Sequence, residues 1–173
     1  MKDSIIVGFS KPKAWYMPFS LLIQLVTWCK FSHTYIRYED IYAKRNIVFQ
    51  AKGLLVNFIG KPLFDSAEDI YAEFEIPLTK KTKLKTIKFA IDNVGKPYAV
   101  MQIVGFMWVM LANLFGKRVN NPFYNGSSYF CSELVTDILE EIKSVDDTMD
   151  ASTATPKDVY NFLISKGYKP LNS

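Results

Sequence analysis

Two side chains of this 173-residue sequence, Cys131 and His33, have the chemistry of a nucleophile and a general base. A thiolate attacks a carbonyl carbon and an imidazole takes up the thiol proton, so the combination suits covalent acyl transfer. His33 is the only histidine, and the second cysteine, Cys29, lies far from Cys131 in the sequence. One histidine and two distant cysteines are too few ligands for a metal centre. We therefore expect a site that uses no metal ion and no cofactor.

Cys131 is expected in the first turn of a helix. Ser127 and Ser128 precede it and are of a type that caps helix N-termini. A helix N-terminus favours a thiolate through its dipole and free N–H groups, and the N–H of Cys131 is placed to hold an oxyanion. The alternative is that Cys131 is a small buried apolar residue. The predicted apolar face holds Cys131, Leu134, Val135, Ile138 and Ile142, and the predicted polar face holds Glu133, Asp137, Glu140 and Glu141.

His33 lies near the start of a predicted strand, 31–38, which is rich in aromatic and β-branched residues. An imidazole base needs a partner that fixes its tautomer. Gln50, on the next predicted strand, offers an amide oxygen, and Asn46 and Glu39 are weaker candidates for the same role. Because a strand face packs against the apolar face of a helix, His33 and Cys131 are able to meet. The alternative is an ordinary packed or surface histidine.

The remaining pattern predicts a single α+β domain over 1–173. Strands are expected at 5–9, 31–38, 46–51, 54–59 and 69–76, the middle three as an antiparallel meander. Helices are expected at 18–30, 79–94 and 131–142, with a last helix capped by Thr155 and opened by Pro156. Cys29, at the end of the first helix, is interpreted as a core residue.

A hydrophobic helical insertion is predicted at about 98–120. Its apolar part, 98–115, is eighteen residues long, which is near the lower limit for crossing a bilayer. Gln102, Gly105 and Asn113 weaken a transmembrane interpretation. A buried helix or helical hairpin is the main expectation, and a surface that contacts a membrane or a protein partner is the alternative.

The composition limits the class of protein. An apolar fraction of 49% is sufficient for a core, and a net charge of +4 does not argue for nucleic acid as a partner. Two cysteines are too few for a disulfide framework. The apolar run within 1–9 is too short for a secretory signal, so a cytoplasmic location is expected. Association with a virion, or release by lysis, stays open.

Four segments carry a family resemblance: 31–36 (FSHTYI), 48–54 (VFQAKGL), 94–98 (VGKPY) and 129–135 (YFCSELV). They resemble the circularly permuted papain-like cysteine hydrolases of the NlpC superfamily, above all the YiiX-like branch, with lecithin–retinol acyltransferase-type enzymes as relatives. In the permuted branch the chain order is histidine, polar residue, cysteine, as it is here. The resemblance implies a permuted papain-like fold, with an antiparallel sheet packed against helices and the nucleophile at a helix N-terminus.

The resemblance also implies residue roles. Cys131 would be the nucleophile, His33 the base and Gln50 the residue that orients the imidazole. The family often has an acidic residue at the position of Gln50, and a neutral amide stabilises an imidazolium less than a carboxylate does. Three further residues are implied to contact the substrate or its oxyanion: Tyr129, Ser132 and Tyr98.

The implied activity is that of a cysteine peptidase or amidase that works through an acyl-enzyme, with peptide amides of bacterial cell wall as the leading substrate. A lipid-acting thioesterase or acyltransferase with the same residues is the first alternative, motivated by the hydrophobic stretches 18–30 and 98–115. A non-catalytic component of a viral or other assembly is the second.

Overall fold

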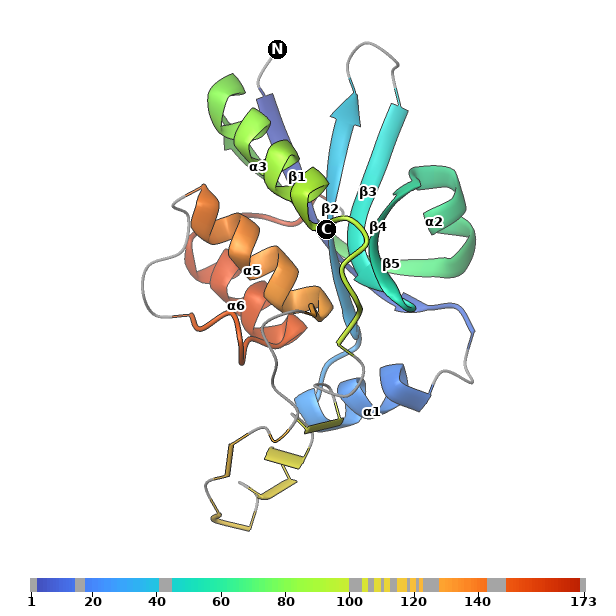
Figure 1. The fold of residues 1–173 in the computed structure, drawn as a ribbon, viewed down its shortest axis with the longest axis vertical. Helices are drawn as coiled ribbons and strands as arrows, with labels where there is room; N and C mark the ends of the chain where they lie inside the picture. The colour runs from blue at the N-terminus through green and yellow to red at the C-terminus, as the bar shows by residue number, and fades with distance from the viewer. Residues whose placement is uncertain are drawn as a thin grey trace.

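The computed structural model describes residues 3–14, 18–40, 45–99, 104–105, 108–109, 111–112, 115–117, 119–120, 122, 128–142 and 149–171. Its centre is an antiparallel five-stranded sheet in the order β4-β3-β2-β1-β5 (Figure 1). The strands are β1 (Asp3–Pro12), β2 (His33–Asp40), β3 (Arg45–Lys52), β4 (Leu55–Gly60) and β5 (Glu68–Leu78). The helices are α1 (Pro18–Thr27), α2 (Lys61–Ala67), α3 (Lys80–Asn93), α5 (Cys131–Glu141) and α6 (Pro156–Ser165).

The expected meander is confirmed, because β2, β3 and β4 are consecutive antiparallel neighbours. β1 lies between β2 and β5, so the first strand of the chain holds the meander to the strand that follows α2. This arrangement is an α+β fold.

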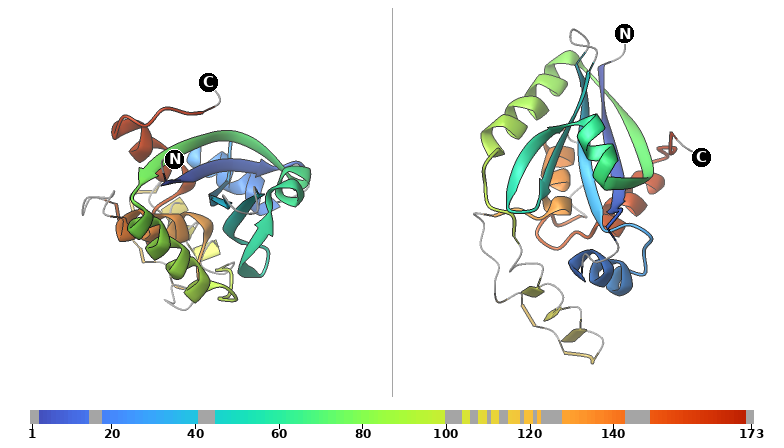
Figure 2. Two further views of the ribbon diagram at one scale, coloured as in Figure 1. Left: turned by 90° about the horizontal axis from the view of Figure 1, so that it is seen from above. Right: turned by 90° about the vertical axis from the view of Figure 1, so that its right-hand side faces the viewer.

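Helices cover both faces of the curved sheet (Figure 2). Alternation along the strands sends Ile36 and Phe49 into the main core, where α5 and α6 contribute Leu134 and Val159. The same alternation sends Tyr35 to the other face, where it packs with Val48 and with Phe64 of α2. The two faces therefore have separate hydrophobic clusters.

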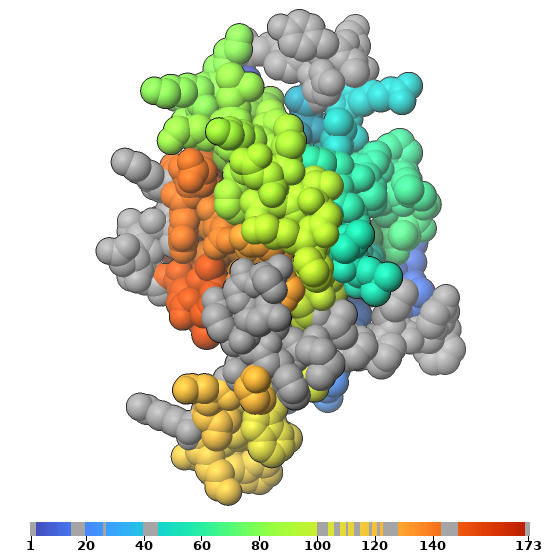
Figure 3. Space-filling view, viewed as in Figure 1, coloured from blue at the N-terminus to red at the C-terminus, as the bar shows by residue number. Residues whose placement is uncertain are grey.

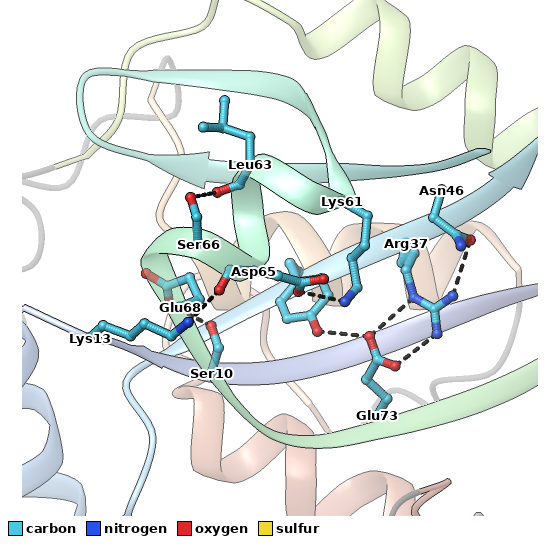
Figure 4. A network of polar contacts seen from close by, with 11 residues as sticks. Ser10, Lys13, Arg37, Asn46, Lys61, Leu63, Asp65, Ser66, Glu68 and Glu73 are labelled. Carbon is cyan, nitrogen blue, oxygen red and sulfur yellow. Dashed lines mark hydrogen bonds and ion pairs between the residues drawn. The ribbon is translucent and has the colours of Figure 1, made fainter.

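Three neighbouring strands are joined across one face by Tyr35, Gly8 and Glu73. Gly8 is in register with both partners, and the Tyr35 hydroxyl donates to Glu73 Oε1 over 2.9 Å. A Cβ on Gly8 would lie 2.1 Å from Tyr35 Cζ, so only glycine leaves room for the ring. Arg37 also binds Glu73, with an Nη2–Oε2 distance of 2.7 Å (Figure 4). The sheet thus contains a buried polar link from β2 to β5.

Two features differ from the sequence predictions. The seven-residue helix α2 was not predicted, because it is too short to show a period and Pro62 stands at its start. The expected helical insertion at 98–120 is described only in pieces, which are helical at 104–105, 108–109 and 111–112, and Gln102 and Asn113 lie outside the described residues. Within the described part of the chain, no helix combines the length and apolar character needed to cross a membrane.

Candidate active site

Cys131 is the first residue of α5, as the sequence predicts, but the helix begins differently from the expected hydroxyl cap. Phe130, not a serine, occupies the N-cap position, and its backbone N–H donates to Glu133 Oε2 over 3.4 Å. Thus a carboxylate three residues into the helix satisfies the N-cap N–H. The serine-cap prediction is wrong because the extended backbone continues through Phe130 before the first turn.

The Cys131 thiol lies against the backbone on either side of His33. Sγ is 4.0 Å from the Ser32 carbonyl oxygen, to which it donates. Burial raises the pKa of Cys131 to about 11, although N–H groups of Thr34, Ser132 and Cys131 itself favour the thiolate. Contrary to the expected thiolate, burial outweighs the helix N-terminus, and the thiol is neutral at pH 7.

The His33 ring forms the hydrogen bond expected from the sequence. Its Nε2 lies 2.9 Å from Gln50 Oε1. An amide oxygen only accepts, so Nε2 carries the proton and Nδ1 holds the lone pair. Gln50 is itself oriented by Asn57, because its Nε2 donates to Asn57 Oδ1 over 3.4 Å. The pair therefore fixes one imidazole tautomer, with Nδ1 as the basic nitrogen.

A buried ion pair that sequence reasoning missed lies close to His33. Glu68 is bound by Lys52. Ser10 Oγ donates to Glu68 Oε2 over 2.7 Å (Figure 4). Burial lowers the pKa of His33 to about 4, with Glu68 opposing the shift and Lys52 adding to it. No pattern in the sequence marks Glu68 as buried, because it begins an alternating strand and resembles a solvent-exposed charge.

The two residues weighed as alternatives to Gln50 lie elsewhere. Asn46 Oδ1 accepts from Arg37 Nη1 over 3.1 Å, and Asn46 faces Glu39 at the far end of the β2–β3 ladder. The structure therefore brings Gln50 alone of these three residues to the imidazole.

The residues expected to contact substrate or oxyanion have different surroundings. The Ser132 hydroxyl is already used, since it donates to the Ala154 carbonyl over 2.6 Å, whereas its backbone N–H faces the Cys131 sulfur. The ring of Tyr98 is near Cys131, and its burial together with a cysteine thiolate charge raises its pKa. Tyr129 pairs with Tyr98 through the backbone, and its side chain hydrogen bonds to Asp137.

The predicted polar face of the cysteine helix is partly buried. Glu133 is only 7% exposed, and burial raises its pKa to about 7, with Asp137 and Asp150 contributing in the same direction. Burial likewise raises the pKa of Asp137 to about 6. The prediction that Glu133 lies on a polar outer face of the helix is therefore wrong, because α5 turns this side chain inward beside its N-cap.

No family model and no curated protein matches this sequence. Among solved structures, it is similar to the Escherichia coli O157:H7 protein yiiX, whose crystal structure is described as that of a metalloprotein of the DUF1105 family. The TM-score is 0.59 and the identity 16%, over 93% of this chain and 92% of that chain. The likeness shows a shared fold.

The described residues do not fit a metal ion. Among the residues that the structure describes, no group of three or more histidine, cysteine, aspartate or glutamate side chains is arranged to hold a metal ion. Each donor near Cys131 and His33 has a different partner: Glu68 binds Lys52, and His33 binds Gln50.

Proposed function

We propose that this protein is a cysteine hydrolase of the permuted papain-like NlpC type, in which Cys131, His33 and Gln50 form the catalytic triad. The observation that carries the proposal is the hydrogen bond from His33 Nε2 to Gln50 Oε1. The residue before His33 is Ser32, and its carbonyl oxygen lies 4.0 Å from Sγ of Cys131. The bond to Gln50 leaves Nδ1 with the lone pair of a base, on the residue that follows Ser32, whose carbonyl oxygen accepts from the Cys131 thiol at the start of α5. The fold shared with yiiX is compatible with this proposal.

The reaction starts from a neutral pair, because burial disfavours both the thiolate and the imidazolium. As Sγ bonds to the substrate carbonyl carbon, the thiol proton moves to Nδ1 of His33. The N–H groups of Cys131 and Ser132 stabilise the developing oxyanion. The C–N bond then breaks, the amine takes the proton from Nδ1, and an acyl-enzyme remains. Water, deprotonated by His33, releases the acid and restores the thiol.

Peptide amides, such as those of bacterial cell wall, are the substrate class that we propose first. A lipid acyl ester or thioester is the second candidate, favoured by exposed apolar side chains on α1, the helix beside the site. Ser20 of α1 hydrogen bonds to Ser32, with an Oγ–Oγ distance of 2.6 Å. This contact brings α1 close to the carbonyl that binds the Cys131 thiol.

The test measures turnover of cell-wall peptide and acyl-lipid panels, together with the intact mass of trapped acyl-enzyme. We expect Cys131→Ala to abolish turnover and adduct, and His33→Ala to slow turnover at least about 100-fold. Cys29→Ser is the matched control and should retain activity. A Cys131→Ala protein that cleaves as the wild type does would refute the triad, as would an adduct on Cys29 alone.

Thiol titration tests the neutral resting pair separately. In a Cys29→Ser background, iodoacetamide should label Cys131 with an apparent pKa above the free-cysteine value of about 8.5. The physical reason is the burial that raises the pKa of Cys131 to about 11. An apparent pKa below about 8.5 would show a preformed thiolate and contradict the mechanism above.

A further inference from the structure

Several apolar residues of the first helix and of its C-terminal end are exposed. Leu21 and Leu25, four residues apart on α1, form an exposed ridge, and Trp28 follows directly after the end of the helix. Trp28 is 87% exposed and Leu25 69% exposed. A different face of α1, which carries Ser20 and Thr27, is turned to the protein. Ser20 bonds to Ser32, and Thr27 is buried. The side of α1 turned to the protein thus carries hydroxyl residues as well as Ile23, while Leu21 and Leu25 face solvent.

Trp28 also has an unusual backbone conformation. Its φ is 51°, in the left-handed region that favours glycine or asparagine at the end of a helix. Its ring is nevertheless almost fully exposed, so burial does not compensate for the strained backbone. An exposed tryptophan held in this conformation is typical of a residue whose partner lies outside the chain.

A second apolar group lies at the same end of the molecule. Among the described residues of 104–117, Trp108, Leu111 and Phe115 are exposed. The described part of this segment, in yellow and orange, projects below the body of the protein (Figure 3). Both segments occupy this end in two perpendicular views (Figures 1 and 2). Ile23 of α1 packs with Tyr98, Ala99 and Phe130, which connects α1 to the start of the second segment.

The two stretches of sequence that contain these apolar groups have basic residues and no acidic ones. No aspartate or glutamate occurs between Asp3 and Glu39 or between Asp92 and Glu133. These stretches contain seven lysine and arginine residues, of which Arg37 is paired with Glu73 in the sheet. Lys30 lies just beyond the end of α1 and Lys117 follows Phe115, and both are exposed. Leucine, tryptophan and lysine side chains without carboxylates form the composition that suits an anionic bilayer surface.

We propose that the ridge of α1 and the tryptophan after it, together with Trp108, Leu111 and Phe115, dock this protein on an anionic lipid bilayer. The apolar side chains enter the boundary of headgroups and acyl chains, and the nearby lysines contact the phosphates. The proposal does not depend on Cys131 chemistry. It does mean that α1, which is hydrogen bonded to Ser32, lies between the membrane and the site.

The experiment is co-sedimentation of the full chain with vesicles of phosphatidylcholine alone or with one quarter phosphatidylglycerol. A Cys131→Ala protein is used throughout, so that failure of binding is separate from failure of catalysis. We expect binding to the mixed vesicles, at least about tenfold weaker binding to phosphatidylcholine, and weakening by salt. Trp28→Gly should relieve the left-handed strain, keep the fold and still weaken binding about tenfold.

Leu25→Asp tests the ridge, and Leu84→Asp is its control. Leu84 is an exposed leucine on α3, and it is surrounded by Lys80, Lys81, Lys85 and Lys88. The control therefore also tests whether this basic surface of α3, and not the α1 ridge, binds the vesicles. We expect Leu25→Asp to abolish binding and Leu84→Asp to change it less than about twofold. The proposal is overturned by an absence of binding, by equal binding to both vesicles, by loss with Leu84→Asp alone, or by a dimer in solution that Leu25→Asp dissociates.

Discussion

At the scale of single residues, the protonation of His33 is decided by its immediate neighbours. Burial drives its pKa down to about 4, and the negative charge of Glu68 limits the fall. Because His33 is the only histidine, a single imidazole signal reports this balance by NMR.

We predict that the His33 signal titrates near pH 4 and that Glu68→Gln lowers this pKa further. The variant removes a negative charge and leaves Lys52 unpaired, and both changes disfavour an imidazolium. Glu75→Gln, at an exposed position of the same strand, is the control and should leave the titration unchanged. A wild-type midpoint near 6.5, or a rise in Glu68→Gln, would contradict this account.

Gln50 gives a second prediction, on turnover. Gln50→Leu removes the acceptor at Nε2 and should reduce kcat about 10- to 100-fold, since the ring then loses its fixed tautomer. Gln50→Glu keeps an acceptor, adds a negative charge beside the ring and should restore activity, with a raised His33 pKa. The two variants are compared in kcat against pH. Equal losses in both would show that Gln50 serves packing and not imidazole orientation.

At the scale of elements, the sheet depends on the close approach of β1 and β2. Gly8→Ala should destabilise the protein by about 3 kcal/mol, because the new methyl group collides with the Tyr35 ring. Gly60→Ala is the matched control, since its Cβ would approach Pro62 no closer than 3.9 Å, and it should cost less than about 0.5 kcal/mol. Urea unfolding of both variants measures the difference. Similar midpoints would show that the Tyr35 ring can move aside.

The strands and most helices were predictable because their patterns extend over several residues. The alternation of Ile70, Ala72, Phe74 and Ile76 within β5 is one example, and the Thr155–Pro156 start of α6 is another: Thr155 Oγ1 accepts from the Asp158 N–H. Three-dimensional burial was not predictable from local pattern. Glu68 and Glu133 look like exposed charges in sequence, yet neighbouring elements cover both.

In the candidate site, too, local pairing could be predicted from the sequence and burial could not. The pairing of His33 with Gln50 could be predicted, because adjacent strands carry both side chains. The neutral state of Cys131 could not, because the helix N-terminus favours the thiolate and only the assembled fold supplies the burial that opposes it. The surroundings of His33 also needed the fold, since β5 brings Glu68 there from outside the meander.

At the scale of the whole molecule, stability depends on pH through groups with opposite effects. The pKa of Glu133 is raised to about 7, so the stability that its protonated form provides is lost as the pH rises from about 4.5 to about 7. The pKa of His33 is lowered to about 4, so the stability provided by its neutral form is lost as the pH falls from about 6.5 to about 4.

Glu133→Gln should therefore gain stability relative to the wild type as the pH rises from about 4.5 to about 7, by on the order of 2 kcal/mol. Chemical denaturation at several pH values measures this change, with Glu140→Gln, at an exposed site of the same helix, as the control. A difference between wild type and Glu133→Gln that does not vary with pH would show that Glu133 is ionised in the folded protein.

The order of β2 and α5 along the chain also determines when the proposed site can exist during synthesis. A ribosome adds about 5–20 residues per second, so Cys131 is made roughly 5–20 s after His33. All five strands precede α5, which means that the sheet can assemble on the ribosome while the nucleophile is still untranslated. A nascent chain that stops before residue 131 carries the proposed base and its orienting amide but not the proposed nucleophile. The proposed chemistry thus begins only after the start of α5 has been synthesised.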